Sequence, residues 1–293
     1  MAMSRRTRQR RSLWRGLCLG ALLVLPLAAA ADAQAPAPAA GWDPLTGPRS
    51  RLQRDWIGAR PLAPDVPILV MAGHADAQGV AGSGTAGAAV DRSGAPPMQP
   101  GIRDELYWNL QVAQRVVNLG RQRGLNMTFY DPPQRSIVSG DDPRTNWSKG
   151  KAWAAAGGYA LEIHFDAYGP DGVGSGVMPA LLRPFSRIDE SLAQAFGGYP
   201  MWFRGGLGGP RRGITLLEIG KLEAPLEPAL RNPSSRELAL NAIAERVVSA
   251  METGLGRAPG PQPLQPTASV SRPPDGAGSA PPAPDRPASS GGG

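Results

Sequence analysis

The chain has 293 residues, a formal net charge of +7, one cysteine and two histidines. A positive charge of this size would favour a nucleic-acid partner if it were spread over a folded domain. Residues 1–33, however, hold six arginines and one aspartate, a net +5, so the rest of the chain carries only +2. A nucleic-acid-binding function therefore loses its main support.

The N-terminus has the three parts of a secretory signal peptide, which we place at residues 1–33. An arginine-rich start precedes an apolar stretch at 17–27, and the small residues at 31–33 offer a cleavage site. The run at 10–15 loosely resembles a twin-arginine signal, so the general secretory and the twin-arginine routes both stay open. We expect an exported protein of the periplasm, cell envelope or extracellular space, with no transmembrane span in the mature chain.

The remaining sequence divides into three parts by composition. We expect a linker at 34–60, in which Trp42, Leu52 and Trp56 are candidates for docking on the domain, and a single folded domain at 61–256. Residues 257–293 are mostly Pro, Gly, Ala and Ser, which predicts a disordered tail. Cys18, the only cysteine, lies inside the signal peptide, so a disulfide or a cysteine zinc site is excluded from the mature chain.

Apolar runs and helical patterns alternate through the folded domain. This order predicts an α/β fold, a mixed and mostly parallel sheet flanked by helices. Segments that lack periodicity are expected to be loops. The strands are expected at 67–73, 125–130, 159–165 and 213–219, the helices at 102–123, 146–156, 188–197 and 234–253, and the loops at 75–101, 169–184 and 198–212.

Both histidines lie where a predicted strand ends. His74 closes the run that begins at Pro67, and His164 lies near the end of the run that begins at Tyr159. Open α/β sheets bind ligands at the carboxyl ends of their strands, so the two imidazoles are expected at one edge of the sheet. One such histidine would be explained more simply as a hydrogen-bonded structural residue, whereas two indicate a metal site.

The helix predicted at 102–123 carries Glu105 and Asn109 within the arc of its apolar residues. A carboxylate on a buried face is unfavourable unless it is paired with a cation or a metal. Alone, Glu105 would be explained by an ion pair with Arg103 or by the N-terminal amides of its helix. With the two histidines, it completes a ligand set that catalytic zinc uses, which leaves a fourth position for water.

A further glutamate, Glu218, interrupts the apolar run at 213–219 close to its end. Catalytic zinc lowers the pKa of water, and the reaction then needs an acidic residue that accepts and returns a proton. Glu218 is the candidate for this general base. The structural alternative is a buried ion pair with Lys221 or Arg211.

Taken in order, these motifs resemble the zinc-dependent N-acetylmuramoyl-L-alanine amidases of the family-3 type, and the resemblance covers the whole folded domain. Ile68–His74 resembles that family's first strand ending in Gly-His, and Glu105–Asn109 resembles its Glu-x-x-x-Asn helix start. Ile163–His164 is similar to its second ligand strand. Leu216–Gly220 is similar to its late strand with the general base, followed by an amphipathic helix at 234–251.

The resemblance implies one Zn²⁺ ion on His74, Glu105 and His164, with Glu218 as the catalytic base. The implied reaction is hydrolysis of the amide between N-acetylmuramic acid and the L-alanine that begins the peptidoglycan stem peptide. Peptidoglycan or a muropeptide is therefore the implied substrate, and export fits its place outside the cytoplasmic membrane. We expect a monomer, and the sequence does not indicate any activator protein.

The string around the second histidine departs from the family's common Ser-Ile-His-x-Asn. Glu162 and Asp166 stand in this string and place two more carboxylates near the metal. Glu162 shares a face with His164 by strand alternation, so it could hydrogen-bond the imidazole, adjust the zinc or compete with Glu218 as base. Ala75 and Asp76 follow the first histidine, where the family usually has glycine after Gly-His. Asp76 and Asp166 are candidates for supporting a ligand or contacting substrate, although loop caps are the simpler explanation.

Two other functions stay open. A zinc hydrolase of the same fold that acts on another amide or peptide is suggested by Glu162, Asp166 and the loops at 75–101 and 198–212. A non-catalytic, metal-binding protein that binds or regulates the cell wall is the other alternative. The presence of Glu218 argues against it.

Overall fold

The computed structural model describes residues 41–260. The predicted signal peptide at 1–33 lies outside the described residues, as does all but the first part of the predicted tail at 257–293. Within the described part of the chain, no helix is long and apolar enough to cross a membrane.

A five-stranded sheet with the order β4-β3-β5-β7-β6 forms the centre of the domain. Its parallel strands are β3 (Ile68–Ala72), β4 (Met127–Tyr130), β5 (Tyr159–Asp166) and β7 (Thr215–Lys221). β6 (Gly176–Met178) pairs antiparallel with β7 at one edge. The predicted fold class, a mixed and mostly parallel sheet flanked by helices, is confirmed.

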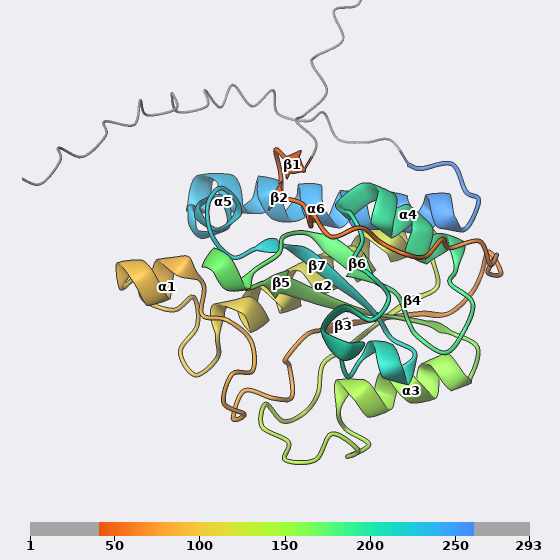
Figure 1. The fold of residues 1–293 in the computed structure, drawn as a ribbon, viewed down its shortest axis with the longest axis horizontal. Helices are drawn as coiled ribbons and strands as arrows, with labels where there is room; N and C mark the ends of the chain where they lie inside the picture. Colours follow the sequence, from red (N-terminus) through yellow and green to blue (C-terminus); the bar gives the residue numbers. More distant parts are fainter. Residues whose placement is uncertain (1–40, 261–293) are drawn as a thin grey trace, which may run out of the picture. The chain divides into compact units, whose positions relative to one another are not determined.

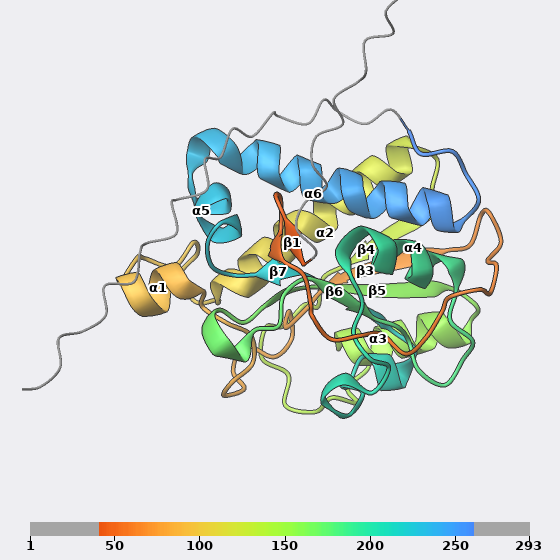
Figure 2. The same cartoon turned by 45° about the horizontal axis from the view of Figure 1, so that its top comes forward.

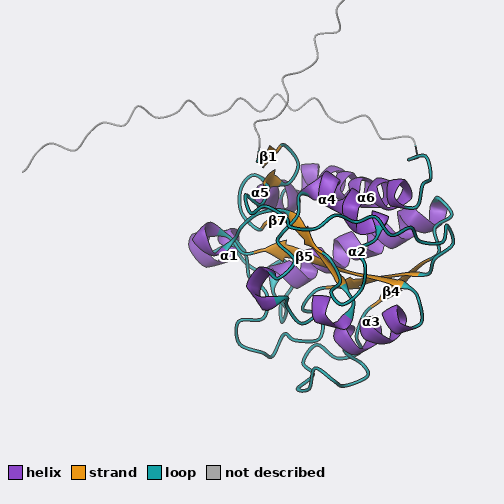
Figure 3. Cartoon of the chain, turned by 45° about the vertical axis from the view of Figure 1, so that its right-hand side comes forward, coloured by secondary structure: helices purple, strands orange, loops and turns teal. Residues whose placement is uncertain are grey.

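Helices cover both faces of this sheet, which explains why its central strands are largely apolar and almost wholly buried. On one face, α2 (Asp104–Gln122), α4 (Arg187–Phe196) and α6 (Pro233–Gly254) share the main hydrophobic core with the strands. On the other face, α3 (Asn146–Ala155) covers a smaller core around Met71 (Figure 1, Figure 3). α2 and α6 run side by side over the sheet (Figure 2).

Besides an N-terminal hairpin and three 3₁₀ turns, three short elements were not predicted. α1 (Ala88–Ser93) lies within the segment expected to be a loop at 75–101, and none of its residues is buried. α5 (Leu226–Arg231) precedes the last helix, and β6 lies within the segment expected to be a loop at 169–184. Each is six residues or shorter, and such a segment is too short to show a helical or strand period.

The segment 41–60, within the expected linker, lies against the domain. A two-stranded hairpin of β1 (Trp42–Asp43) and β2 (Gly47–Pro48) begins it. The Asp43 carboxylate accepts a hydrogen bond from Arg246 of α6 at 2.8 Å. Trp56 is buried and donates its indole N–H to a main-chain carbonyl at 2.8 Å, whereas Trp42 and Leu52 are exposed.

Candidate metal and catalytic site

Three strand ends and the start of one helix, far apart in the sequence, meet at the carboxyl edge of the parallel strands. His74 follows β3 with only Gly73 between them, and His164 lies near the end of β5. Glu218 on β7 is the register partner of His164, so the two side chains share one face of the sheet. Glu105 enters from the first turn of α2.

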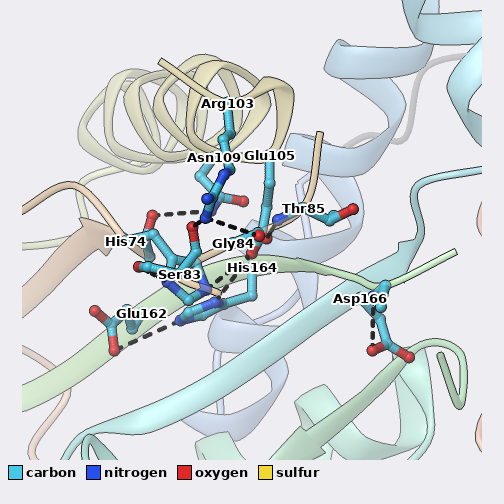
Figure 4. A network of polar contacts seen from close by, with 12 residues as sticks. His74, Ser83, Gly84, Thr85, Arg103, Glu105, Asn109, Glu162, His164 and Asp166 are labelled. Atoms are coloured by element: carbon cyan, nitrogen blue, oxygen red, sulfur yellow. Dashed lines mark hydrogen bonds and ion pairs between the residues drawn. The ribbon is translucent and has the colours of Figure 1, made fainter. Parts of the chain in front are cut away.

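The side chains of His74, Glu105 and His164 converge, with one possible ligand atom from each lying within 4.8 Å of the others. Glu105 Oε1 lies 3.3 Å from His74 Nε2 and 3.3 Å from His164 Nδ1 (Figure 4). The two imidazole rings are nearly perpendicular, at 86°. The structure thus brings together the three residues that were predicted as metal ligands.

The donor chemistry of this group fits a divalent cation. Glu105 is only 3% exposed, and its sole ion-pair partners within the described residues are the two imidazoles. Burial alone would raise its pKa, but His74 and His164 hold the pKa of this carboxyl well below its usual value. Burial opposes the charge of His164, but Glu105 and Glu162 raise the pKa of His164 well above its usual value. Two imidazole nitrogens and a buried carboxylate oxygen that converge in this way form a zinc-type donor set.

The ion pair with Arg103, considered for Glu105, is not formed. Arg103 instead donates to the main-chain carbonyls of Ser83 and Gly84 in the loop above the site. That loop contacts two of the three residues: Ser83 Oγ lies 2.9 Å from His74 Nδ1, and the Thr85 N–H donates to Glu105 Oε2 at 2.8 Å. The sequence did not reveal these contacts, because the segment is aperiodic and one contact is made by the main chain.

Asn109 is buried one turn beyond Glu105, on the same face of α2. Its Nδ2 donates to the carbonyl of Gly73 at 3.0 Å and so ties α2 to the main chain beside His74. Gly73 itself lies against the second imidazole, because a Cβ at this position would be 2.2 Å from His164 Cε1. Asn109 and Gly73 therefore position the two histidines.

Glu218 is free of the ion pairs that were considered for it. Lys221 pairs with Glu223, and Arg211 donates to a main-chain carbonyl. Glu218 Oε2 is buried and has no hydrogen-bond partner among the described residues. Burial, reinforced by the charges of Asp166 and Glu105 and opposed by that of His164, raises the pKa of Glu218 to about 8.

Glu162 is also buried, at 3% exposure, on the same face of β5 as His164. Its Oε1 accepts a hydrogen bond from Asn146 Nδ2 at 2.9 Å, and its Oε2 lies 3.6 Å from His164 Nε2. Burial would raise its pKa, but His164 and Asn146 lower the pKa of this carboxyl below its usual value. Glu162 is therefore an ionised group enclosed behind His164.

The two remaining carboxylates that were considered for the site cap local structure. Asp166 accepts hydrogen bonds from the N–H groups of Ala167, Val173 and Gly174, and a register shift in β5 separates it from His164 (Figure 4). Asp76 Oδ2 accepts the N–H of Asn146 at 2.7 Å, at the start of α3. Neither carboxylate belongs to the group around Glu105.

Comparison with solved structures found similarity to N-acetylmuramoyl-L-alanine amidases, the family that the sequence motifs resemble. The catalytic domain of CwlV from Bacillus (Paenibacillus) polymyxa var. colistinus is 17% identical, covers 65% of this chain and 98% of its own, and gives a TM-score of 0.45. Ami1 from Mycobacterium abscessus is 16% identical, with 64% and 98% covered and a TM-score of 0.42. A putative amidase from Neisseria meningitidis is 14% identical, with 67% and 99% covered and a TM-score of 0.42.

Comparisons with protein-family models and with curated proteins found no match. The function proposed below therefore rests on the site residues of this chain.

Proposed function

We propose that this protein is a zinc-dependent N-acetylmuramoyl-L-alanine amidase, which hydrolyses the amide between N-acetylmuramic acid and the L-alanine of peptidoglycan stem peptides. The observation that carries the proposal is the convergence of His74, Glu105 and His164 with Glu218 as the register partner of His164. The order of the sequence motifs supports the choice of substrate.

In this proposal, His74 Nε2, His164 Nδ1 and a Glu105 oxygen would hold one Zn²⁺ ion, because these atoms face one another in the group. When bound, zinc supplies a Lewis acid that polarises the substrate carbonyl and makes water more acidic. The residues around the group keep its members in place. Ser83 contacts His74, the Thr85 N–H binds Glu105, and each contact leaves the atom that faces the group free.

Glu218 would carry the proton. It accepts a proton from the attacking water at its carboxylate and returns this proton to the amine that leaves as the amide bond breaks. A general base works best when its pKa lies near the working pH, and burial raises the pKa of Glu218 to about 8. The positive charge of a metal ion would lower this pKa from that value toward neutrality.

The alternative of a zinc hydrolase acting on another substrate was suggested by Glu162, Asp166 and the loops at 75–101 and 198–212. Both side chains are enclosed: Glu162 lies behind His164, and Asp166 caps a loop. Both carboxylates are bound by groups of the protein itself, so they do not by themselves favour a different substrate. The non-catalytic alternative does not explain a buried Glu218 oxygen that has no hydrogen-bond partner in the described part of the chain.

We propose export to the periplasm or cell envelope through a signal peptide at residues 1–33, a monomeric catalytic domain at 61–256, and a non-catalytic tail at 257–293. Peptidoglycan would be met in that compartment. Residues 41–60 would stay with the mature domain, since Asp43 and Trp56 are bound to it.

The test is an assay of the purified protein, without residues 1–33, on muropeptides of known composition. Release of the intact stem peptide, identified by product mass, is expected with zinc and is expected to stop when a chelator removes the metal. Glu218→Gln should be inactive while still binding zinc. Cleavage at another amide would favour the alternative hydrolase, and zinc binding without any hydrolysis would favour the non-catalytic alternative.

A further inference from the structure

The two histidines of the site present different ring nitrogens to Glu105. His74 does so with Nε2 and leaves Nδ1 toward Ser83 Oγ, at 2.9 Å. His164 does so with Nδ1 and leaves Nε2 on the opposite side of its ring. A neutral imidazole that binds a metal through one nitrogen carries its proton on the other, so the two rings require opposite tautomers.

The nitrogen that His164 leaves behind faces Glu162. His164 Nε2 is buried and has no hydrogen-bond partner among the described residues, and Glu162 Oε2 lies 3.6 Å from it, within ion-pair distance. The ring has little freedom to turn away, because the main chain at Gly73 lies against its edge and leaves no room for a Cβ.

Glu162 is itself fixed on its other side. Asn146, the first residue of α3, donates both hydrogens of its amide: one to Glu162 Oε1 at 2.9 Å and one to the carbonyl of Ala72 at 2.6 Å. Gly209 lies against the same carboxylate, because a Cβ there would be 3.1 Å from Glu162 Oε2. The carboxylate therefore cannot reach around His164 to the group formed with Glu105.

We propose that Glu162, oriented by Asn146, is a positioning residue for the metal site. With zinc bound, a small shortening of the 3.6 Å separation between Glu162 Oε2 and His164 Nε2 would let Glu162 accept the Nε2 proton and keep the Nδ1 lone pair directed at the cation. A carboxylate partner on the far nitrogen also increases the basicity of the ligating one. This inference rests on the metal-binding part of the proposed function and assigns to Glu162 neither the role of ligand nor that of general base.

The first test measures tautomers in the unaltered protein. Long-range ¹H–¹⁵N correlations are recorded on zinc-loaded, ¹⁵N-labelled protein without a histidine tag. Because the chain has two histidines, comparison with one His74 variant assigns the signals of both rings. We expect the proton on Nδ1 of His74 and on Nε2 of His164. A proton on Nδ1 of His164, with zinc on Nε2, would overturn the proposal.

The second test is Glu162→Gln. The carboxamide has one oxygen for two donors, so its NH₂ must face either Asn146 Nδ2 or the Nε2 proton of His164. We expect zinc affinity, measured by competition with a chromophoric chelator, to fall by about 10- to 100-fold. The ligand-field spectrum of the Co²⁺-substituted protein should change as well. Unchanged affinity and an unchanged spectrum would contradict the proposal.

Glu252→Gln is the matched control, because Glu252 is equally buried, at 3%, and pairs with Arg123 at the C-terminal end of α6, away from the histidines. It should lower thermal stability without changing zinc affinity. None of these readouts uses hydrolysis. Zinc binding with the expected tautomers but no amidase activity would refute the proposed function alone, whereas no zinc binding by the unaltered protein would refute both.

Discussion

Gly73→Ala offers a sharp test of how the site is built. Gly73 joins β3 to His74, and a Cβ at this position would lie 2.2 Å from His164 Cε1 and 2.5 Å from Nδ1. Gly73, unlike many glycines of the described chain, does not have a positive φ, so its backbone conformation is compatible with alanine. The obstacle to the methyl group is therefore the imidazole ring itself.

The size of the effect follows from these distances. Ordinary contact begins at 3.4 Å, so the ring must retreat by about 1.2 Å. Metal–ligand distances tolerate about 0.2 Å, so His164 would leave ligand geometry altogether. Loss of a group that supports a ligand lowers metal affinity by about 10- to 100-fold. Displacement of the ligand itself should have at least the larger effect, so we expect zinc affinity to fall by about 100-fold or more. Overpacking at a buried site should also lower the free energy of unfolding by about 1–3 kcal/mol.

The assay is chelator competition for zinc, with thermal melts of the metal-free protein recorded in parallel. Gly140→Ala is the control, because a Cβ there would meet only the ring of Trp147, at 3.2 Å, outside the group around Glu105. It should leave zinc affinity unchanged. If Gly73→Ala bound zinc as tightly as the unaltered protein, the close approach of Gly73 to His164 would have no part in positioning the ligand.

Three further predictions concern the base, the metal and the N-terminal hairpin. Glu218→Gln should slow amide hydrolysis by about 10²- to 10⁴-fold with zinc affinity retained, and equal loss of both would contradict its role as base. Zinc at 100 times its Kd should raise the free energy of unfolding by about 2.7 kcal/mol, and a melt that chelator does not shift would exclude a metal ligated only in the folded state. Asp43→Asn should lower the free energy of unfolding at pH 7 by about 1.5–3 kcal/mol, because Asp43 accepts charged hydrogen bonds from Arg49 and Arg246. Burial raises the pKa of Asp43, but the two arginines lower it below its usual value of 3.8. The difference in unfolding free energy between Asp43→Asn and the unaltered protein should therefore persist above pH 3.8 and shrink as the pH falls further. A difference that does not change with pH would refute this reasoning.

The fold could be predicted because its main elements are long enough to show an apolar run or a helical pattern. The four parallel strands are apolar runs, since both faces of the sheet are covered, and α2, α4 and α6 each turn an apolar face to one core. β6 and α1 could not be predicted, because they are too short. Three or six residues are too few to show a period, and the pairing of β6 with β7 comes from tertiary contacts.

In the site, the four central residues could be predicted, whereas the contacts that support them could not. His74, Glu105, His164 and Glu218 could be found because each places a polar group where an apolar residue is expected. Their supporting contacts could not be found, because the Thr85 contact is a main-chain N–H and those of Asn109 and Gly73 depend on a close approach of α2 to β3. The sequence also could not predict on which side of the His164 ring Glu162 lies.

The distribution of the site over the chain has a consequence for folding. Glu105 and His164 are 59 residues apart, and β3, β5 and β7 become neighbours only when their crossover helices have docked. Contacts of such long range form late, since loop closure must precede them. The proposed cation site would therefore be complete only once the sheet is assembled, unlike the site of a zinc finger, whose ligands lie close together in the sequence. A chain that crosses a membrane unfolded would acquire its metal from the compartment in which it folds.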